Sequence, residues 1–188
     1  MQEPRCFNNQ ELEKVDNAVF RAEELVNNFF KMSSGQWLKN RYDIKTFKDL
    51  ASHEQICGPF AQVVKYAARK KEASLGSSAF SFYTICLQDS AILSVLETNK
   101  TLLLDPFLLY ILTHELVHIV RFLRFEHRYE NAGEADLTLV EERKVHHLTY
   151  LILHPVSLAG LEAVFDFYCE WRQGQGGDML AKKNNDLS

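Results

Sequence analysis

The sequence predicts an α+β fold that is mostly helical and carries a small antiparallel sheet. Apolar residues recur at three- and four-residue spacing in several long segments, which is typical of amphipathic helices. After residue 78 the spacing changes to two, among aromatic and β-branched residues typical of strands. The 188 residues are enough for one hydrophobic core, so we expect a single domain over residues 1–172. Residues 173–188 are Gly-rich and polar, and we expect them to be a disordered tail.

Two helices are predicted in the first 75 residues. Asn9 is a suitable cap for the first helix, and Ser33–Gly35 ends it. Its apolar face consists of Leu12, Val15, Val19, Ala22, Leu25, Val26 and Phe29. A second helix is predicted from about residue 53 to 71, although Gly58 and Pro59 stand in its first turns.

The middle and the end of the chain predict the sheet and three further helices. Segments 80–88 and 91–97 should pair as an antiparallel hairpin, and residues 101–104 are expected to add a short third strand. Asp105 as cap and Pro106 at the first helical position then open a buried helix. Two more helices are predicted at about 134–153 and 158–172, separated by His154-Pro155.

Composition and charge exclude several classes of function. A net charge of −4 predicts neither a nucleic-acid partner nor an anionic membrane surface. The apolar stretch 102–125 is interrupted by polar and charged residues, so we expect a core helix and no membrane span. The N-terminus lacks a signal-peptide pattern. The four cysteines contain no CxxC pair, which favours a reducing compartment, and we expect a cytoplasmic protein.

The segment His114-Glu115-Leu116-Val117-His118 carries the clearest chemical signal. On a helix, residues four apart lie on the same face, so both imidazoles can bind one metal ion, and zinc suits this ligand type. Glu115 lies about 100° around the helix, where its carboxylate can take a proton from a water molecule beside the metal. Burying these polar groups in an apolar helix is costly unless something satisfies them, which favours a metal over a polar core cluster.

Zinc needs a third protein ligand, and residues 137–153 offer one. This predicted helix carries Glu141, Glu142, His146 and His147 among apolar residues. Over about residues 80–153, the HELVH motif, the downstream glutamate and the preceding strands resemble the gluzincin branch of the zincin metallopeptidases. Metzincins are excluded, because Arg121 and Arg124 stand where their extended motif has glycine and a third histidine.

The resemblance implies a zincin-like fold, with the small sheet beside the HExxH helix, and zinc held by His114, His118 and a glutamate. In that class a polar group often follows the ligand glutamate by four residues, which makes Glu142, followed by His146, the first choice. Glu141 is the alternative, because it shares a face with apolar residues of its helix.

The expected function is therefore that of a zinc peptidase acting on a peptide or protein substrate. Glu115 would be the general base, and we expect His146 as a second catalytic residue that stabilises the oxyanion. Other candidates for that role are His147, Tyr150, Tyr129 and Arg121. A strand of the 80–97 hairpin could pair with an extended substrate. The alternatives are a metal-stabilised binding or regulatory module and a hydrolase of amides outside proteins.

Overall fold

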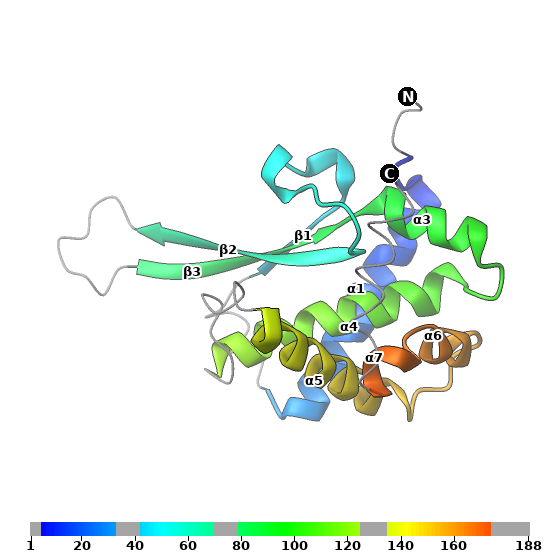
Figure 1. The fold of residues 1–188 in the computed structure, drawn as a ribbon. Helices are drawn as coiled ribbons and strands as arrows, with labels where there is room; N and C mark the ends of the chain where they lie inside the picture. Colours follow the sequence, from blue (N-terminus) through cyan, green and yellow to red (C-terminus); the bar gives the residue numbers. More distant parts are fainter. Residues whose placement is uncertain (1–4, 33–41, 70–78, 125–134, 174–188) are drawn as a thin grey trace.

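A computed structural model describes residues 5–32, 42–69, 79–124 and 135–173. These residues form a mostly helical α+β fold with a small mixed sheet (Figure 1). The strands are β1 (Tyr42–Lys45), β2 (Ala61–Arg69) and β3 (Ala79–Leu87). The helices are α1 (Asn9–Phe30), α3 (Asp89–Thr98), α4 (Leu104–Leu123), α5 (Ala135–Leu153), α6 (Leu161–Phe167) and α7 (Cys169–Gln173). Two single 3₁₀ turns, η1 (Phe47–Asp49) and η2 (Ser52–Glu54), lie between β1 and β2.

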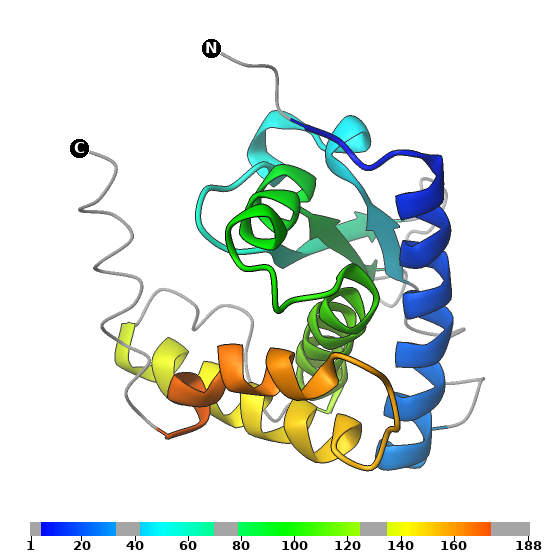
Figure 2. The same ribbon diagram turned by 90° about the vertical axis from the view of Figure 1, so that its right-hand side faces the viewer.

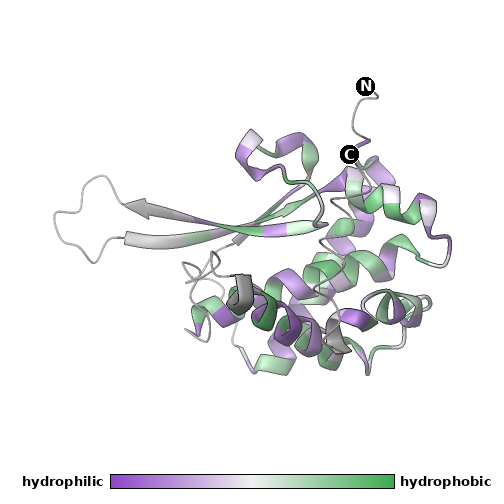
Figure 3. Cartoon of the chain, viewed as in Figure 1, coloured by the Kyte–Doolittle hydropathy of each residue, from purple (hydrophilic) through white to green (hydrophobic). Residues whose placement is uncertain are grey.

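Helix α4 lies in the middle of the molecule. Figure 2 shows it almost end-on, with the sheet and α3 on one side, α1 on another, and α5, α6 and α7 on a third. Every residue from Pro106 to Arg121 is buried. Figure 3 shows the helix as largely hydrophobic along its length. Its length and composition would allow a bilayer span, but 89% of the apolar window is buried inside the molecule, as in core helices.

The sheet has the strand order β1-β3-β2. Strand β2 runs antiparallel to β3, with Ala61 opposite Leu87, whereas β1 runs parallel to β3, with Tyr42 opposite Tyr83. The expectation of a purely antiparallel sheet was therefore wrong. Strand β3 is the central strand: it pairs with β2 along its length and with β1 over Tyr83–Cys86. Within the described ranges, the edges of the sheet are β1 and β2.

The two helices predicted with the clearest apolar face are confirmed. Helix α1 ends at Phe30, and Lys31 adopts the left-handed conformation there. Its cap is Asn8 and not Asn9: the Asn8 side chain accepts from the backbone N–H of Glu11, whose carboxylate accepts from the backbone N–H of Asn8. Helix α5 covers the predicted range to within one residue at its start.

The prediction of a helix over residues 53–71 was wrong, because β2 occupies residues 61–69 of that range. Gly58 has a positive φ of 105° and Pro59 follows it, which separates η2 from the strand. Strand β2 then pairs along its whole length with β3, and this partner is supplied by residues about 20 positions away. Periodicity within 61–69 alone carries no information about that pairing.

The strands predicted at 91–97 and 101–104 were also wrong. Residues 89–98 form α3, which buries Ile92 and Leu93 in the core. A short apolar run fits a strand or a buried helix equally well, and here the tertiary contacts favour the helix. Residues 101–103 form the turn into α4, whose first residue is Leu104, so Asp105 lies in the first turn and not at the cap.

The last predicted helix, 158–172, is divided into α6 and α7. Gly160, with φ of 86°, precedes α6, and a Cβ on it would come within 2.9 Å of the Leu103 side chain. The break at Tyr168 allows its ring and that of Trp171 to face the middle of α5. The tail was predicted over residues 173–188. Gln173 is the last residue of α7, and residues 174–188 lie outside the described residues.

Candidate metal centre

The two motif histidines lie on one face of α4 and point toward the same space. His114 Nε2 and His118 Nε2 are 3.1 Å apart. Both side chains are about one-tenth exposed, so neither is hydrated as a surface histidine would be. Tyr110 lies on the same face of α4, one turn before His114, and its ring stacks near that of His114. The helical spacing of four residues therefore places three polar aromatic side chains in a row.

Helix α5 brings Glu142 to the two histidines. Its Oε2 lies 3.3 Å from His114 Nε2, and its Oε1 lies 3.2 Å from His118 Nε2. Ligand atoms bound tetrahedrally at zinc distances are separated from one another by about 3.3 Å. The three donor groups thus have the mutual spacing of ligands around a single ion. The Glu142 side chain is 31% exposed, so the cluster is reached by solvent from that side.

The donor set fits a cation better than it fits a self-contained polar cluster. The two imidazole Nε2 atoms face each other at 3.1 Å, and each also lies beside a Glu142 oxygen. When both nitrogens are unprotonated, their lone pairs repel each other, and a single cation can accept a lone pair from each of them and from the carboxylate. Among the described residues, the polar contacts of the His114 ring are made through Nε2, and its buried Nδ1 has no hydrogen-bond partner. By contrast, Thr113 Oγ1, buried in the same helix turn, donates to the Leu109 carbonyl at 2.7 Å.

Electrostatics within the cluster favour the charged forms of Glu142 and His118. Burial acts to raise the pKa of Glu142, but hydrogen bonds and charge from His114 and His118 hold it well below its usual range. Burial acts to lower the pKa of His118, yet Glu142, together with Glu115 and Glu141, raises it above its ordinary value. Ionised Glu142 therefore favours positive charge at the histidines, which either a proton or a bound cation can supply.

Glu115 is buried beside the same cluster. Burial raises its pKa, the charges of His114 and His118 lower it, and the charge of Glu142 raises it again. Its carboxylate also influences Cys86 of β3, whose thiol pKa is raised to about 12, mainly by burial. Glu115 thus interacts electrostatically both with the histidine cluster and with Cys86 of β3.

Glu141, the alternative third ligand, contacts Arg121. Glu141 makes two hydrogen bonds with the Arg121 guanidinium, from Nε to Oε1 at 2.5 Å and from Nη2 to Oε2 at 2.9 Å. Neighbouring residues of α5 therefore serve different partners: Arg121 holds Glu141, and the histidines contact Glu142. Arg121, one of the residues considered for oxyanion stabilisation, therefore contacts Glu141 through its guanidinium.

His146, one turn after Glu142, lies at the edge of the cluster. It is buried, and its Nδ1 is 2.9 Å from the Tyr110 hydroxyl. One potential ligand atom each from His114, Glu142 and His146 lie within 4.8 Å of one another. His147 is exposed, and the Tyr150 ring contacts those of His154 and Phe165. Tyr129 lies outside the described residues.

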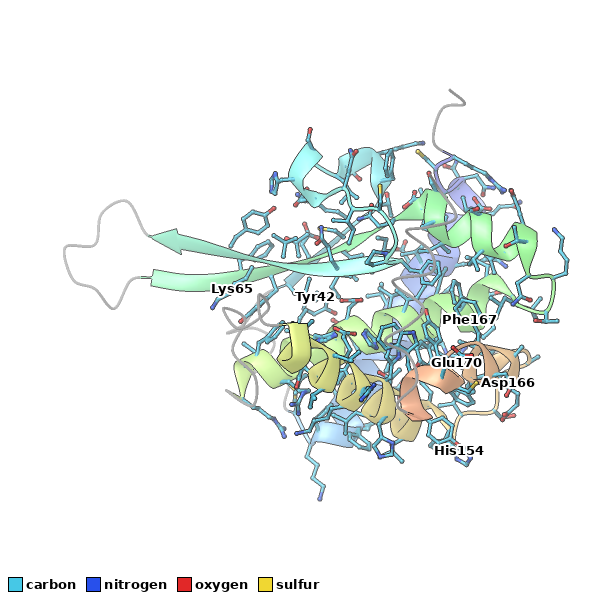
Figure 4. All side chains as sticks on the ribbon, viewed as in Figure 1. Tyr42, Lys65, His154, Asp166, Phe167 and Glu170 are labelled. Carbon is cyan, nitrogen blue, oxygen red and sulfur yellow. The ribbon has the colours of Figure 1, made fainter. Side chains whose placement is uncertain are left out.

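A wall of aromatic rings next to His146 was not predicted from the sequence. The Tyr110 and Tyr168 rings stack with centroids 4.3 Å apart, and the Trp171 ring lies 5.2 Å from that of His146. Phe167, labelled in Figure 4, packs against Phe107 at the start of the same wall. The four-residue spacing of Tyr110, His114 and His118 in the sequence could have predicted that Tyr110 lies beside the histidines. The aromatic rings of α6 and α7 contact these residues only through the tertiary fold.

No protein-family model, curated protein or solved structure matches the chain. The interpretation of the site therefore depends on its geometry and chemistry.

Proposed function

We propose that the protein is a zinc-dependent hydrolase that cleaves peptide bonds. His114, His118 and Glu142 would hold the ion, and Glu115 would be the general base. The observation that carries this proposal is the convergence of three donor groups at 3.1–3.3 Å, with a fourth, non-ligand carboxylate buried beside them. Three protein ligands and a solvent-accessible side are the arrangement of catalytic zinc sites, since structural sites use four protein ligands.

Zinc held there would supply a Lewis acid that polarises a carbonyl group and lowers the pKa of a water molecule. Glu115 would take a proton from the attacking water as its oxygen bonds to the carbonyl carbon. The same carboxylate would return the proton to the amide nitrogen as the carbon–nitrogen bond breaks. His146, whose Nδ1 is 2.9 Å from the Tyr110 hydroxyl, would donate a hydrogen bond to the carbonyl oxygen as negative charge develops on it.

A peptide substrate is supported by the sheet beside the site. Strand β2 packs against α4 and, within the described residues, is paired only on its β3 side. An open strand edge binds an extended peptide through main-chain hydrogen bonds. The edge that could do so is therefore β2, or β1 on the opposite side, in place of the strand expected from the sequence.

The proposal is tested by Glu115→Gln, which is nearly isosteric and removes only the base. We expect zinc content and melting temperature to stay at wild-type values, and hydrolysis of a peptide library to fall on the order of 10²–10⁴-fold. Glu24→Gln is the matched control, because it makes the same change on the exposed face of α1 and should cleave like wild type. Equal cleavage by the wild type and Glu115→Gln would overturn the role of Glu115.

A second candidate is a closed structural zinc site in a binding module, and His146 is the observation that favours it. If the His146 ring supplied a fourth ligand, no position would remain for a substrate. His146→Ala distinguishes the two candidates. A loss of zinc affinity comparable to that of a ligand variant would support the structural site, whereas retained zinc with slower hydrolysis would support the peptidase.

A further inference from the structure

The ion pair between Arg121 and Glu141 is buried to an unusual degree. The Arg121 side chain is 2% exposed and that of Glu141 is 9% exposed. The two planar groups meet through two parallel hydrogen bonds, which fix both distance and orientation. Withdrawing both charges from water costs several kcal/mol per ion, so a buried pair is poor evidence for stability. In some proteins such pairs specify one arrangement of the chain over another, and the question is which arrangement this pair specifies.

Its position answers that question, because the pair joins the two helices that supply the metal cluster. Arg121 follows His118 by three residues, about one turn along α4, and Glu141 directly precedes Glu142 on α5. Neighbouring residues on a helix point about 100° apart. A rotation of α5 by one residue would therefore direct Glu141 toward the histidines and turn Glu142 away from them.

We propose that Arg121 is a positioning residue that sets the rotation of α5 and so selects Glu142, and not Glu141, as the third metal ligand. This inference rests on the zinc site proposed above. Without Arg121, nothing in the chemistry of the two adjacent carboxylates distinguishes them, because both are glutamates on the same turn of the same helix. With Arg121 in place, Glu141 is occupied by a two-point contact and Glu142 is left to face His114 and His118.

The first test removes both charges and keeps the volume. Arg121→Met combined with Glu141→Gln should fold, since buried ion pairs are often replaced by apolar groups at little cost. Zinc affinity, measured by competition with a chromophoric chelator, should fall about 10–100-fold, the range found when groups that orient metal ligands are removed. The control is Lys14→Met with Asp105→Asn, which removes the exposed ion pair between α1 and α4 and should leave zinc affinity unchanged.

The second test separates selection from general packing. In the wild type, Glu142→Ala removes the only positioned carboxylate, whereas in an Arg121→Met background the released Glu141 can replace it. The loss of zinc affinity caused by Glu142→Ala should therefore be at least about tenfold smaller in the Arg121→Met background, a coupling that independent sites do not show. If Arg121→Met does not fold, Arg121→Lys is used for the same cycle, because it keeps the charge and loses the two-point contact.

Equal losses in the two backgrounds, or wild-type zinc affinity in the doubly neutral variant, would overturn this inference alone. A wild-type chain without zinc affinity would overturn the proposed function, and the inference with it.

Discussion

Two buried polar clusters lie on different sides of the fold, and they differ in how they are satisfied. One surrounds Glu54 of η2, whose side chain is 0% exposed next to the sheet. The other is the cluster of His114, His118 and Glu142 between α4 and α5. Both place a carboxylate among nitrogen and oxygen atoms, and both interrupt apolar surroundings.

The Glu54 cluster is complete within the protein. The carboxylate accepts from Lys45 Nζ at 2.8 and 3.1 Å, from the Tyr66 hydroxyl at 2.6 Å and from the Ala51 backbone N–H at 2.7 Å. Gln62 and Gln88 donate to the Glu54 carbonyl. Every oxygen of this residue thus meets a donor that protein alone supplies, and the cluster holds the 47–56 segment on the sheet.

The histidine cluster lacks such complementarity. Two imidazole nitrogens and two carboxylate oxygens converge at 3.1–3.3 Å, so the partners of the Glu142 carboxylate in this cluster are the two histidines, whereas Arg121 pairs with Glu141. A buried carboxylate is therefore structural where the protein provides its hydrogen-bond donors. It is a candidate for ligand binding where possible ligand atoms, such as histidine nitrogens and carboxylate oxygens, face one another.

The largest expected difference between the clusters concerns zinc affinity. Glu142→Ala should weaken zinc binding by more than about 100-fold, because the loss of a ligand exceeds the 10–100-fold effect of groups that only orient ligands. Glu54→Ala should leave zinc affinity at the wild-type value. Chelator competition, with zinc content by elemental analysis, measures both. Similar zinc affinities for the two variants would contradict the distinction between the clusters.

A smaller difference is expected in acid. The hydrogen bonds from Lys45 and Tyr66 lower the pKa of Glu54 from 4.5 to about 2. Because the pKa is lowered on folding, the ionised carboxylate stabilises the fold above about pH 4.5, and this contribution is lost as the pH falls toward 2. Glu54→Gln should therefore show a flatter dependence of unfolding free energy on pH in this window. Urea unfolding at a series of pH values measures it, and a slope equal to that of wild type would refute this prediction.

The smallest expected effect is that of Tyr66→Phe. This change removes the phenol hydrogen bonds to Glu54 and His53 and leaves the Lys45 and Ala51 bonds to Glu54 in place, so the free energy of unfolding should fall by about 1–2 kcal/mol. Zinc affinity should not change, because Tyr66 belongs to the cluster that is complete without a metal. Urea unfolding and chelator competition on the same sample measure the two quantities, and a change in zinc affinity would show that the clusters are coupled.

Much of the helical part of the fold could be predicted from the sequence. The apolar faces of α1 and α5 repeat over many turns, and the buried character of α4 follows from its composition. The predictions failed at 61–69 and 91–97, where the segments are short. Strand β2 depends on pairing with β3, and α3 depends on burying Ile92 and Leu93, so both are decided by residues distant in the chain.

The sequence by itself determined that two histidines and a glutamate share a buried helix, because the i, i+4 relation is local and needs no partner. Which downstream glutamate approaches them was decided only by the tertiary structure. Glu141 and Glu142 have the same chemistry and differ by one helical step, so their roles depend on the rotation of α5 relative to α4. That rotation is set by contacts between helices, among them the Arg121–Glu141 pair, which no local pattern encodes.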